Sequence, residues 1–176
     1  MDIGTGSGVL GISVLLQNPE RFEHVFLSDL SADALLVAKQ NYDRLIDARK
    51  YDLRIVQSDL CVFLESYPHI TANKNLILTA NLPYIPDATF DQNSPRNVQK
   101  REPRMAFVGG DDGLDLYRKM FAQLLALKEQ FADVTMFLEM MTWQIELLRQ
   151  EFAEVIVFEE VKTFHFNIRI LKATLT

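Results

Sequence analysis

The chain begins Met1-Asp2-Ile3-Gly4-Thr5-Gly6-Ser7-Gly8, and this stretch decides its fold. It predicts a short apolar strand that runs into a glycine-rich turn, and residues 9–16 then have the pattern of a helix. Glycine lets the backbone turn tightly and approach a ligand closely. The first N–H groups of a helix have no partner within it, so they can bind an anion or a carboxylate. The stretch therefore predicts a nucleotide-type cofactor site.

Two classes of cofactor fit the spacing of these glycines. Residues 6–11 match the dinucleotide fingerprint G-x-G-x-x-G, with Asp29 at a workable distance for a ribose contact. Residues 2–8 fit the S-adenosylmethionine loop of Rossmann-like methyltransferases equally well. Asp2 favours the second class, because a carboxylate repels a pyrophosphate and attracts the cationic amino group of methionine. The residues expected to bind S-adenosylmethionine in this turn are Asp2, Gly4, Thr5, Gly6 and Gly8.

Composition limits the partners of the protein. The 176 residues carry a net charge of −6, which argues against broad binding to a phosphate backbone, so nucleic acid is not expected as a direct partner. This balance leaves room for a local basic patch, for which residues 95–104 are the best candidate. No apolar run is long enough to cross a membrane and no signal-peptide pattern precedes the turn, so no membrane partner is expected.

Cysteine and histidine usage indicates the compartment and the absence of a metal. Cys61 is the only cysteine, so an intrachain disulfide cannot form and a cytoplasmic location fits. The histidines, His24, His69 and His165, lie far apart and lack metal-ligand spacing, so no metal site is expected.

Strand and helix patterns alternate along the chain, which is typical of an α/β fold with a mostly parallel sheet. Strands are expected at 23–29, 53–57, 76–80 and 134–139, with a terminal antiparallel hairpin at 154–160 and 166–175. Helices are expected at 32–48 after an N-cap at Ser31, at 60–64, at 114–130 and at 143–152. Residues 81–112 are expected to be one long irregular stretch, which in a compact domain is usually functional or disordered.

Two further acids follow strands of the expected sheet. Asp29 ends the second strand and Asp59 follows the third, and open α/β sheets bind ligands at the carboxyl ends of their strands. Asp29 could accept hydrogen bonds from both ribose hydroxyls, and Asp59 could accept one from the adenine amino group, with Leu60 against the ring. Asp2, Asp29 and Asp59 together indicate an S-adenosylmethionine site more specifically than any one of them does alone.

The fourth strand is followed by Asn81-Leu82-Pro83-Tyr84, which resembles the Asn-Pro-Pro-Tyr signature of methyltransferases that act on planar nitrogens. Such a nitrogen is a poor nucleophile because its lone pair is delocalised. Acceptors on its two hydrogens, the Asn81 side-chain oxygen and the Leu82 carbonyl, would hold it as the methyl group arrives. Tyr84 can pack flat against the planar group. Catalysis would then rest on positioning and electrostatics, without a metal or a covalent intermediate.

Residues 102–118 resemble the Glu-Pro…Gly-Gly-x-Asp-Gly-Leu…Tyr-Arg segment of the HemK/PrmC family, and Glu139, Gln144 and Arg169 also match that family. The resemblance implies a Rossmann-like class I methyltransferase with a seven-stranded sheet. It also implies that the protein uses S-adenosylmethionine, releases S-adenosylhomocysteine and methylates a glutamine side chain of a peptide chain release factor. The substrate residues that it implies are Asn81, Leu82, Pro83, Tyr84 and Glu102, of which Asn81, Pro83 and Tyr84 are catalytic and Asn81 also contacts the cofactor.

The sequence departs from that family in two ways. Leu82 stands where the family usually has proline, and Asn-Leu-Pro-Tyr is similar to rRNA adenine dimethyltransferases, so an adenine-N6 methyltransferase on RNA or DNA is the main alternative. The family also carries a helical N-terminal recognition domain and a full first strand. We therefore expect residues 1–176 to form a single catalytic domain with a truncated first strand, and a non-catalytic remnant that only binds cofactor or partner is a third hypothesis. A dinucleotide-dependent oxidoreductase is the most distant one.

Overall fold

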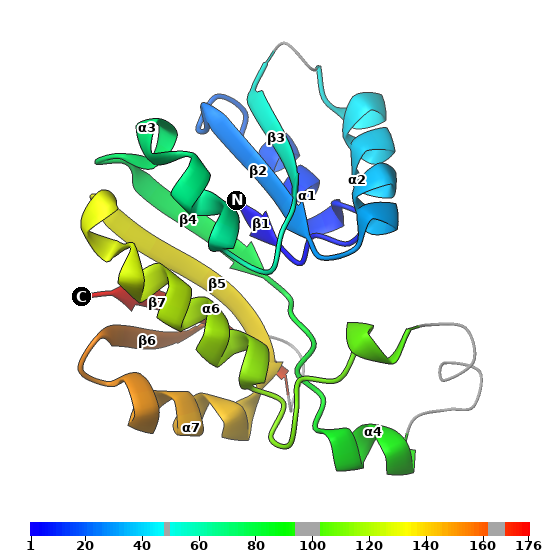
Figure 1. Cartoon of the computed structure of the whole chain (residues 1–176), viewed down its shortest axis with the longest axis vertical. Helices are drawn as coiled ribbons and strands as arrows, with labels where there is room; N and C mark the ends of the chain where they lie inside the picture. The colour runs from blue at the N-terminus through cyan, green and yellow to red at the C-terminus, as the bar shows by residue number, and fades with distance from the viewer. Residues whose placement is uncertain (48–49, 94–102, 162–167) are drawn as a thin grey trace.

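The strands of the molecule are β1 (Asp2–Ile3), β2 (His24–Asp29), β3 (Asp52–Gln57), β4 (Asn75–Ala80), β5 (Asp133–Met141), β6 (Ile156–Val161) and β7 (Ile168–Leu175). They form a seven-stranded sheet in the order β3-β2-β1-β4-β5-β7-β6 (Figure 1). β1 to β5 pair in parallel, whereas β7 pairs antiparallel with both β5 and β6. This computed structural model describes residues 1–47, 50–93, 103–161 and 168–176. The expected mostly parallel sheet with a terminal antiparallel hairpin is confirmed.

Helices connect the parallel strands. The α-helices are α1 (Val9–Gln17), α2 (Ala32–Leu45), α3 (Pro68–Thr71), α4 (Asp87–Asn93), α6 (Asp115–Ala126) and α7 (Thr142–Phe152). The short 3₁₀-helices are η1 (Val62–Ser66), η2 (Arg104–Ala106) and η3 (Lys128–Gln130). Among the described residues, no helix is both long enough and apolar enough to cross a membrane.

Strand β2 shows that helices cover both faces of the sheet. Leu27 belongs to a buried cluster that includes Ile12 of α1 and Tyr42 of α2. Phe26 points to the opposite face, because side chains alternate along a strand, and its ring packs against Phe63 of η1 with the centroids 5.3 Å apart. Burial on both faces explains why the middle of β2 consists of consecutive apolar residues, Val25, Phe26 and Leu27.

Helix α2 begins as expected and ends early. The Ser31 hydroxyl accepts a hydrogen bond from the Ala34 N–H at 3.2 Å, which confirms the predicted N-cap. The helix ends at Leu45, because Ile46 adopts an extended backbone and is buried in the core. The prediction of helix to residue 48 was therefore too long.

The prediction of an irregular stretch over 81–112 is wrong for Asp87–Asn93, which form α4. The Phe90 N–H donates to the Pro86 carbonyl at 3.0 Å, and the buried Phe90 ring stacks on Phe107 with the centroids 5.7 Å apart. This stabilising contact joins residues 17 positions apart, so local sequence patterns do not reveal it.

Other element boundaries differ by a few residues. The helix expected at 60–64 is the 3₁₀-helix η1, and the helix expected at 114–130 is divided into α6 and η3, separated by Leu127. Residues 162–167, within which the expected turn of the terminal hairpin and the first two residues of its second strand fall, lie outside the described residues. These differences leave the carboxyl ends of β1, β2, β3, β4 and β5 at one edge of the sheet, as the prediction requires.

Candidate active site

A cavity of about 510 Å³ lies at this edge of the sheet, a size typical of ligand pockets. The glycine-rich turn after β1 lines one side of it, and the ends of β4, β5 and β7 line the other. Of the predicted site residues, the cavity brings together Asp2, Gly4, Thr5, Gly6 and Asn81. Glu139, at the end of β5, also lines it.

Asp2 organises the glycine-rich turn. Its side chain is buried, and one carboxylate oxygen accepts hydrogen bonds from the Thr5 hydroxyl at 2.6 Å and the Gly11 N–H at 3.0 Å. The other oxygen accepts from the Thr79 hydroxyl of β4 at 2.7 Å. The acid thereby joins the turn, α1 and β4 in one arrangement. Its expected contact with a methionine amino group stays a prediction.

The glycines of the turn have different surroundings. Gly6 has a φ of +56°, and a Cβ added there would meet nothing within 4 Å, so the backbone lies open to a ligand. Gly8 is buried instead, and a Cβ there would lie 3.2 Å from the Cβ of Ala38 in α2. The structure therefore places Gly8 where α1 packs against α2, and Gly6 beside the cavity.

Asp29 and Asp59 lie beyond the lining of this cavity, at the ends of β2 and β3. Asp29 accepts hydrogen bonds from the Gly6 N–H at 2.8 Å and the Ser31 N–H at 2.9 Å, so it links the turn to the start of α2. Asp59 forms an ion pair with Lys119 of α6. Sequence reasoning missed Lys119, because no local pattern connects two residues 60 positions apart.

Leu60, expected against an adenine ring, is buried and adopts a left-handed backbone with φ of +57°. Its carbonyl accepts a hydrogen bond from the Ser28 hydroxyl of β2 at 3.3 Å. The contact fixes the turn after β3 beside the end of β2, so the two predicted acids share one edge of the sheet. The adenine contact itself stays a prediction.

The Asn81–Tyr84 loop leaves β4 beside the cavity. The Asn81 side chain is exposed and makes no hydrogen bond with any described residue, so its amide is available to a ligand. Tyr84 donates a hydrogen bond from its hydroxyl to the Glu139 carboxylate at 3.0 Å. Pro83 lies between them, and its carbonyl is so close to Gly109 that a Cβ there would approach it to 2.4 Å. Glu102 lies outside the described residues.

The Tyr84 hydroxyl is held in its protonated form. Burial, together with the nearby Glu139 carboxylate, raises the pKa of Tyr84 to about 12. The pKa of a tyrosine in the unfolded chain is about 10, so the hydrogen bond of the Tyr84 hydroxyl stabilises the fold fully below pH 10. This stabilisation is lost as the pH rises through 12, where the folded tyrosine ionises. At neutral pH the phenol therefore acts as a hydrogen-bond donor that fixes its own ring.

The variant Tyr84→Phe tests this interaction. We expect it to lower the free energy of unfolding by about 1 kcal/mol. The difference from wild type should stay constant between about pH 7 and pH 9 and shrink above about pH 10, because the tyrosine then starts to ionise. Urea unfolding at three pH values measures it. A difference that grows above about pH 10 would contradict the assigned donor.

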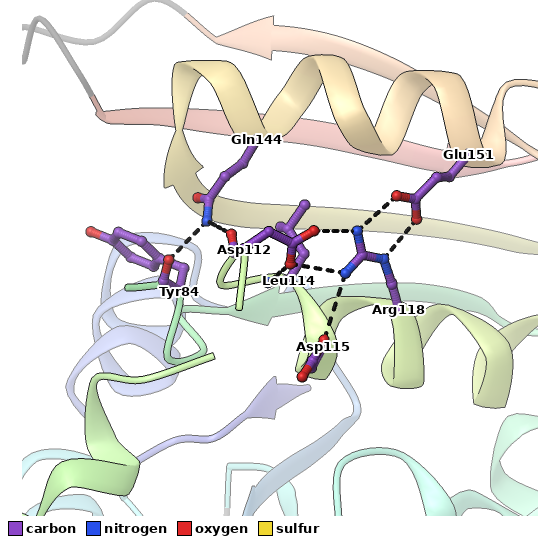
Figure 2. A network of polar contacts seen from close by, with 7 residues as sticks. All are labelled: Tyr84, Asp112, Leu114, Asp115, Arg118, Gln144 and Glu151. Carbon is purple, nitrogen blue, oxygen red and sulfur yellow. Dashed lines mark hydrogen bonds and ion pairs between the residues drawn. The ribbon is translucent and has the colours of Figure 1, made fainter. Parts of the chain in front are cut away.

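Gln144, at the start of α7, connects the Asn81–Tyr84 loop to the segment that precedes α6 (Figure 2). It is completely buried, and its side-chain N–H groups donate to the carbonyls of Tyr84 and Asp112, both at 2.8 Å. Its side-chain oxygen accepts from the Met141 N–H at 2.9 Å. Every polar group of the amide is thus used to fix backbone near the cavity.

Arg118 holds the same segment from the other side (Figure 2). Its guanidinium donates two hydrogen bonds to the Asp112 carboxylate, at 2.9 and 2.6 Å, and two to Glu151 of α7, both at 2.7 Å. Hydrogen bonds from Arg118 lower the pKa of both acids and, in turn, raise the pKa of the guanidinium. Binding two carboxylates by two hydrogen bonds each requires the planar guanidinium of arginine.

The variant Arg118→Lys should lower the free energy of unfolding at pH 7 by about 1 kcal/mol, since solvent partly screens this half-exposed network. Because folding lowers the pKa of Asp112 and Glu151, their ion pairs with Arg118 stabilise the fold fully above the pKa of these acids in the unfolded chain, about 4. This stabilisation is lost as the pH falls through their pKa values in the folded protein. Unfolding curves of both proteins from about pH 7 to pH 3 check this. An equal difference at every pH would refute the ionic contribution.

Comparisons with known proteins show which proteins the chain resembles. No family model matches it. The release factor glutamine methyltransferase of Bacillus cereus is 37% identical over 123 residues, covering 70% of the chain and 40% of that protein. The Bacillus subtilis protein of that name is 34% identical over 132 residues, covering 74% of the chain and 42% of the relative. A ribosomal protein uL3 glutamine methyltransferase of Burkholderia pseudomallei is 34% identical and covers 70% of the chain and 38% of the relative.

Solved structures share the fold at low identity. The human METTL16 catalytic domain in complex with a MAT2A 3′UTR hairpin has a TM-score of 0.70 at 14% identity, over 98% of the chain and 61% of the domain. The ribosomal protein L11 methylase of Lactobacillus delbrueckii subsp. bulgaricus has a TM-score of 0.57 at 14% identity, over 99% of the chain and 67% of that protein. The chain spans about two fifths of the length of its curated relatives. By sequence it therefore belongs with the HemK/PrmC release factor glutamine methyltransferases, and it has the class I methyltransferase fold.

Proposed function

We propose that the chain transfers a methyl group from S-adenosylmethionine to the side-chain amide nitrogen of a glutamine in a protein, with a peptide chain release factor as the acceptor. One observation carries the proposal: a single cavity is lined by the open glycine-rich turn on one side and the free Asn81 amide on the other. The names of the curated relatives, which act on release factors and a ribosomal protein, support the acceptor class.

Residues that line the cavity, together with Asp29 and Asp59 beyond its lining, suit the cofactor. The open backbone at Gly6 and the start of α1 suit the methionine end, and the carboxylates of Asp29 and Asp59 suit the hydroxyls and the amino group of an adenosine. When bound, S-adenosylmethionine supplies a methyl group on a positively charged sulfur, which leaves as a thioether. Asp29 keeps its position on the turn through the Gly6 N–H, so it would bind the ribose without rearrangement.

Asn81 and Leu82 would hold the acceptor. The Asn81 side-chain oxygen and the Leu82 carbonyl would each accept one hydrogen bond from the glutamine amide, which orients its nitrogen toward the cofactor side of the cavity. Tyr84, fixed by Glu139, would pack against the plane of the amide. The site therefore acts by placing acceptors where positive charge develops on nitrogen, and it needs no residue to form a covalent bond.

Calorimetric titration with S-adenosylhomocysteine, with NAD as the control ligand, tests the cofactor. We expect binding of S-adenosylhomocysteine in the micromolar range and no heat with NAD. Asp29→Asn, which keeps the shape of the side chain and removes its charge, should weaken binding by about tenfold. Binding of NAD alone would refute the proposal and favour a dinucleotide enzyme. A folded protein that binds neither ligand would also refute it.

Leu82 favours a second candidate, methylation of the adenine amino group in RNA or DNA, since Asn-Leu-Pro-Tyr is similar to rRNA adenine dimethyltransferases. The basic patch at 95–104 lies almost wholly outside the described residues, and Arg104, at its described end, is engaged by Asp87 and Asp91. Titration of an RNA hairpin at increasing salt discriminates the candidates. A steep fall of affinity with salt would support nucleic acid as the substrate, and no binding would remove this candidate.

A further inference from the structure

The Tyr117 hydroxyl joins two backbone segments at the site. Tyr117 lies in α6 and is completely buried. Its hydroxyl accepts a hydrogen bond from the Leu82 N–H at 3.2 Å and donates one to the Glu139 carbonyl of β5 at 2.6 Å. The same Glu139 accepts from the Tyr84 hydroxyl through its side chain. The residues on both sides of Pro83 are therefore fastened to the end of β5.

Leucine at position 82 makes this contact necessary. Proline would fix φ and bring no N–H, whereas leucine leaves φ free and adds a donor that must find a partner once it is buried. Leu82 is buried, and the Tyr117 hydroxyl supplies that partner. The Leu82 side chain also lies against the glycine-rich turn, because a Cβ added at Gly4 would approach its Cδ2 to 2.9 Å.

We propose that Tyr117 is a positioning residue for the acceptor: its hydroxyl bonds the Leu82 N–H and so holds the Leu82 carbonyl and Asn81 in place, the task that a proline ring performs by fixing φ. The inference rests on the proposed function. Burial raises the pKa of Tyr117, so the hydroxyl stays protonated and donates to Glu139 at every working pH. The hydroxyl donates mainly to the Glu139 carbonyl at 2.6 Å, and the Leu82 carbonyl is its second, longer acceptor at 3.5 Å. Since a carbonyl oxygen has two lone pairs, one of them remains for a substrate.

A double-mutant cycle tests the proposal with Tyr117→Phe, Leu82→Pro and the combination. In the Leu82 background, Tyr117→Phe should lower kcat by about tenfold, because it leaves a buried N–H without a partner. Its affinity for S-adenosylhomocysteine and its KM for the acceptor should change by less than about twofold. In the Leu82→Pro background, which has no N–H to satisfy, Tyr117→Phe should lower kcat by less than about twofold.

Tyr42→Phe is the matched control. Tyr42 is also a buried tyrosine, but its hydroxyl has no hydrogen-bond partner among the described residues, so the substitution should leave kcat unchanged. An equal loss of kcat from Tyr117→Phe in both backgrounds would overturn the proposal, since it would show a structural role that does not act through the Leu82 N–H.

Amide hydrogen exchange gives a readout that does not depend on turnover. The Leu82 amide should exchange slowly in wild type, at least about tenfold faster in Tyr117→Phe, and at the wild-type rate in Tyr42→Phe. Unchanged exchange in Tyr117→Phe would overturn the proposal. Faster exchange in Tyr117→Phe, together with a wild-type protein that methylates no glutamine, would support the bond between the Tyr117 hydroxyl and the Leu82 N–H and refute the proposed function. A failure of this inference can therefore be told apart from a failure of the proposed function.

Discussion

Asn81→Ala should lower kcat for glutamine methylation by about 100- to 1,000-fold, and it should weaken binding of S-adenosylhomocysteine, which Asn81 is also predicted to contact, by only about two- to threefold. The Asn81 amide lines the cavity and has no partner among the described residues, so its removal takes one acceptor from the substrate and no contact from the fold. The loss should appear in kcat, because the interaction strengthens as the nitrogen becomes positively charged. Steady-state kinetics combined with calorimetry measure both quantities.

Asn75→Ala provides the control for this variant. Asn75 is also an exposed asparagine of the β4 segment, but it lies at the start of the strand, away from the cavity. It should keep wild-type turnover. Wild-type turnover in Asn81→Ala would remove Asn81 from the reaction, and equal losses in both variants would show that the effect is not specific to the site.

Gln144→Leu should have the largest effect on stability. The substitution keeps the approximate volume of the side chain and leaves the Tyr84 and Asp112 carbonyls and the Met141 N–H without partners in a buried place. We expect a loss of about 3–5 kcal/mol in the free energy of unfolding and a fall in melting temperature of about 10 °C or more. Differential scanning calorimetry measures the fall.

Gln150→Leu provides the control on the same helix. Gln150 is exposed near the end of α7, so the same replacement there should change the melting temperature by less than about 2 °C. If Gln144→Leu melted within that range as well, the polar contacts of Figure 2 would not stabilise the two segments at the cavity. A normal melting temperature with low turnover would instead assign Gln144 a role in the reaction.

Patterns that are local in sequence predicted the sheet and the edge that carries the site. Alternating strand and helix signals, the N-cap at Ser31 and the glycine-rich turn each depend on neighbouring residues, and the structure confirms them. The expected positions of Asp29 and Asn81 follow from the same reasoning, since parallel strands bring their carboxyl ends to one edge. Their contacts with ligands stay predictions.

Contacts between distant residues could not be predicted in this way. Thr79 lies 77 positions from Asp2, and Tyr117 lies 35 positions from Leu82, yet these pairs decide which polar groups remain available in the cavity. The sequence predicts Asp2 as a ligand for the cofactor, which stays a prediction, but it does not reveal that the Asp2 oxygens also bind the Thr5, Gly11 and Thr79 donors that shape the turn. Helix α4 is likewise stabilised by the distant Phe107 ring.

Methyl transfer to a purified release factor tests the central claim most directly. The chain is incubated with the factor and with S-adenosylmethionine that carries a labelled methyl group, and tandem mass spectrometry locates the label. The account predicts one methyl group on the side-chain amide nitrogen of a glutamine, and none when Asn81→Ala replaces wild type. Label on adenine of an added RNA with none on the protein, or no label on either while S-adenosylhomocysteine binds, would contradict it.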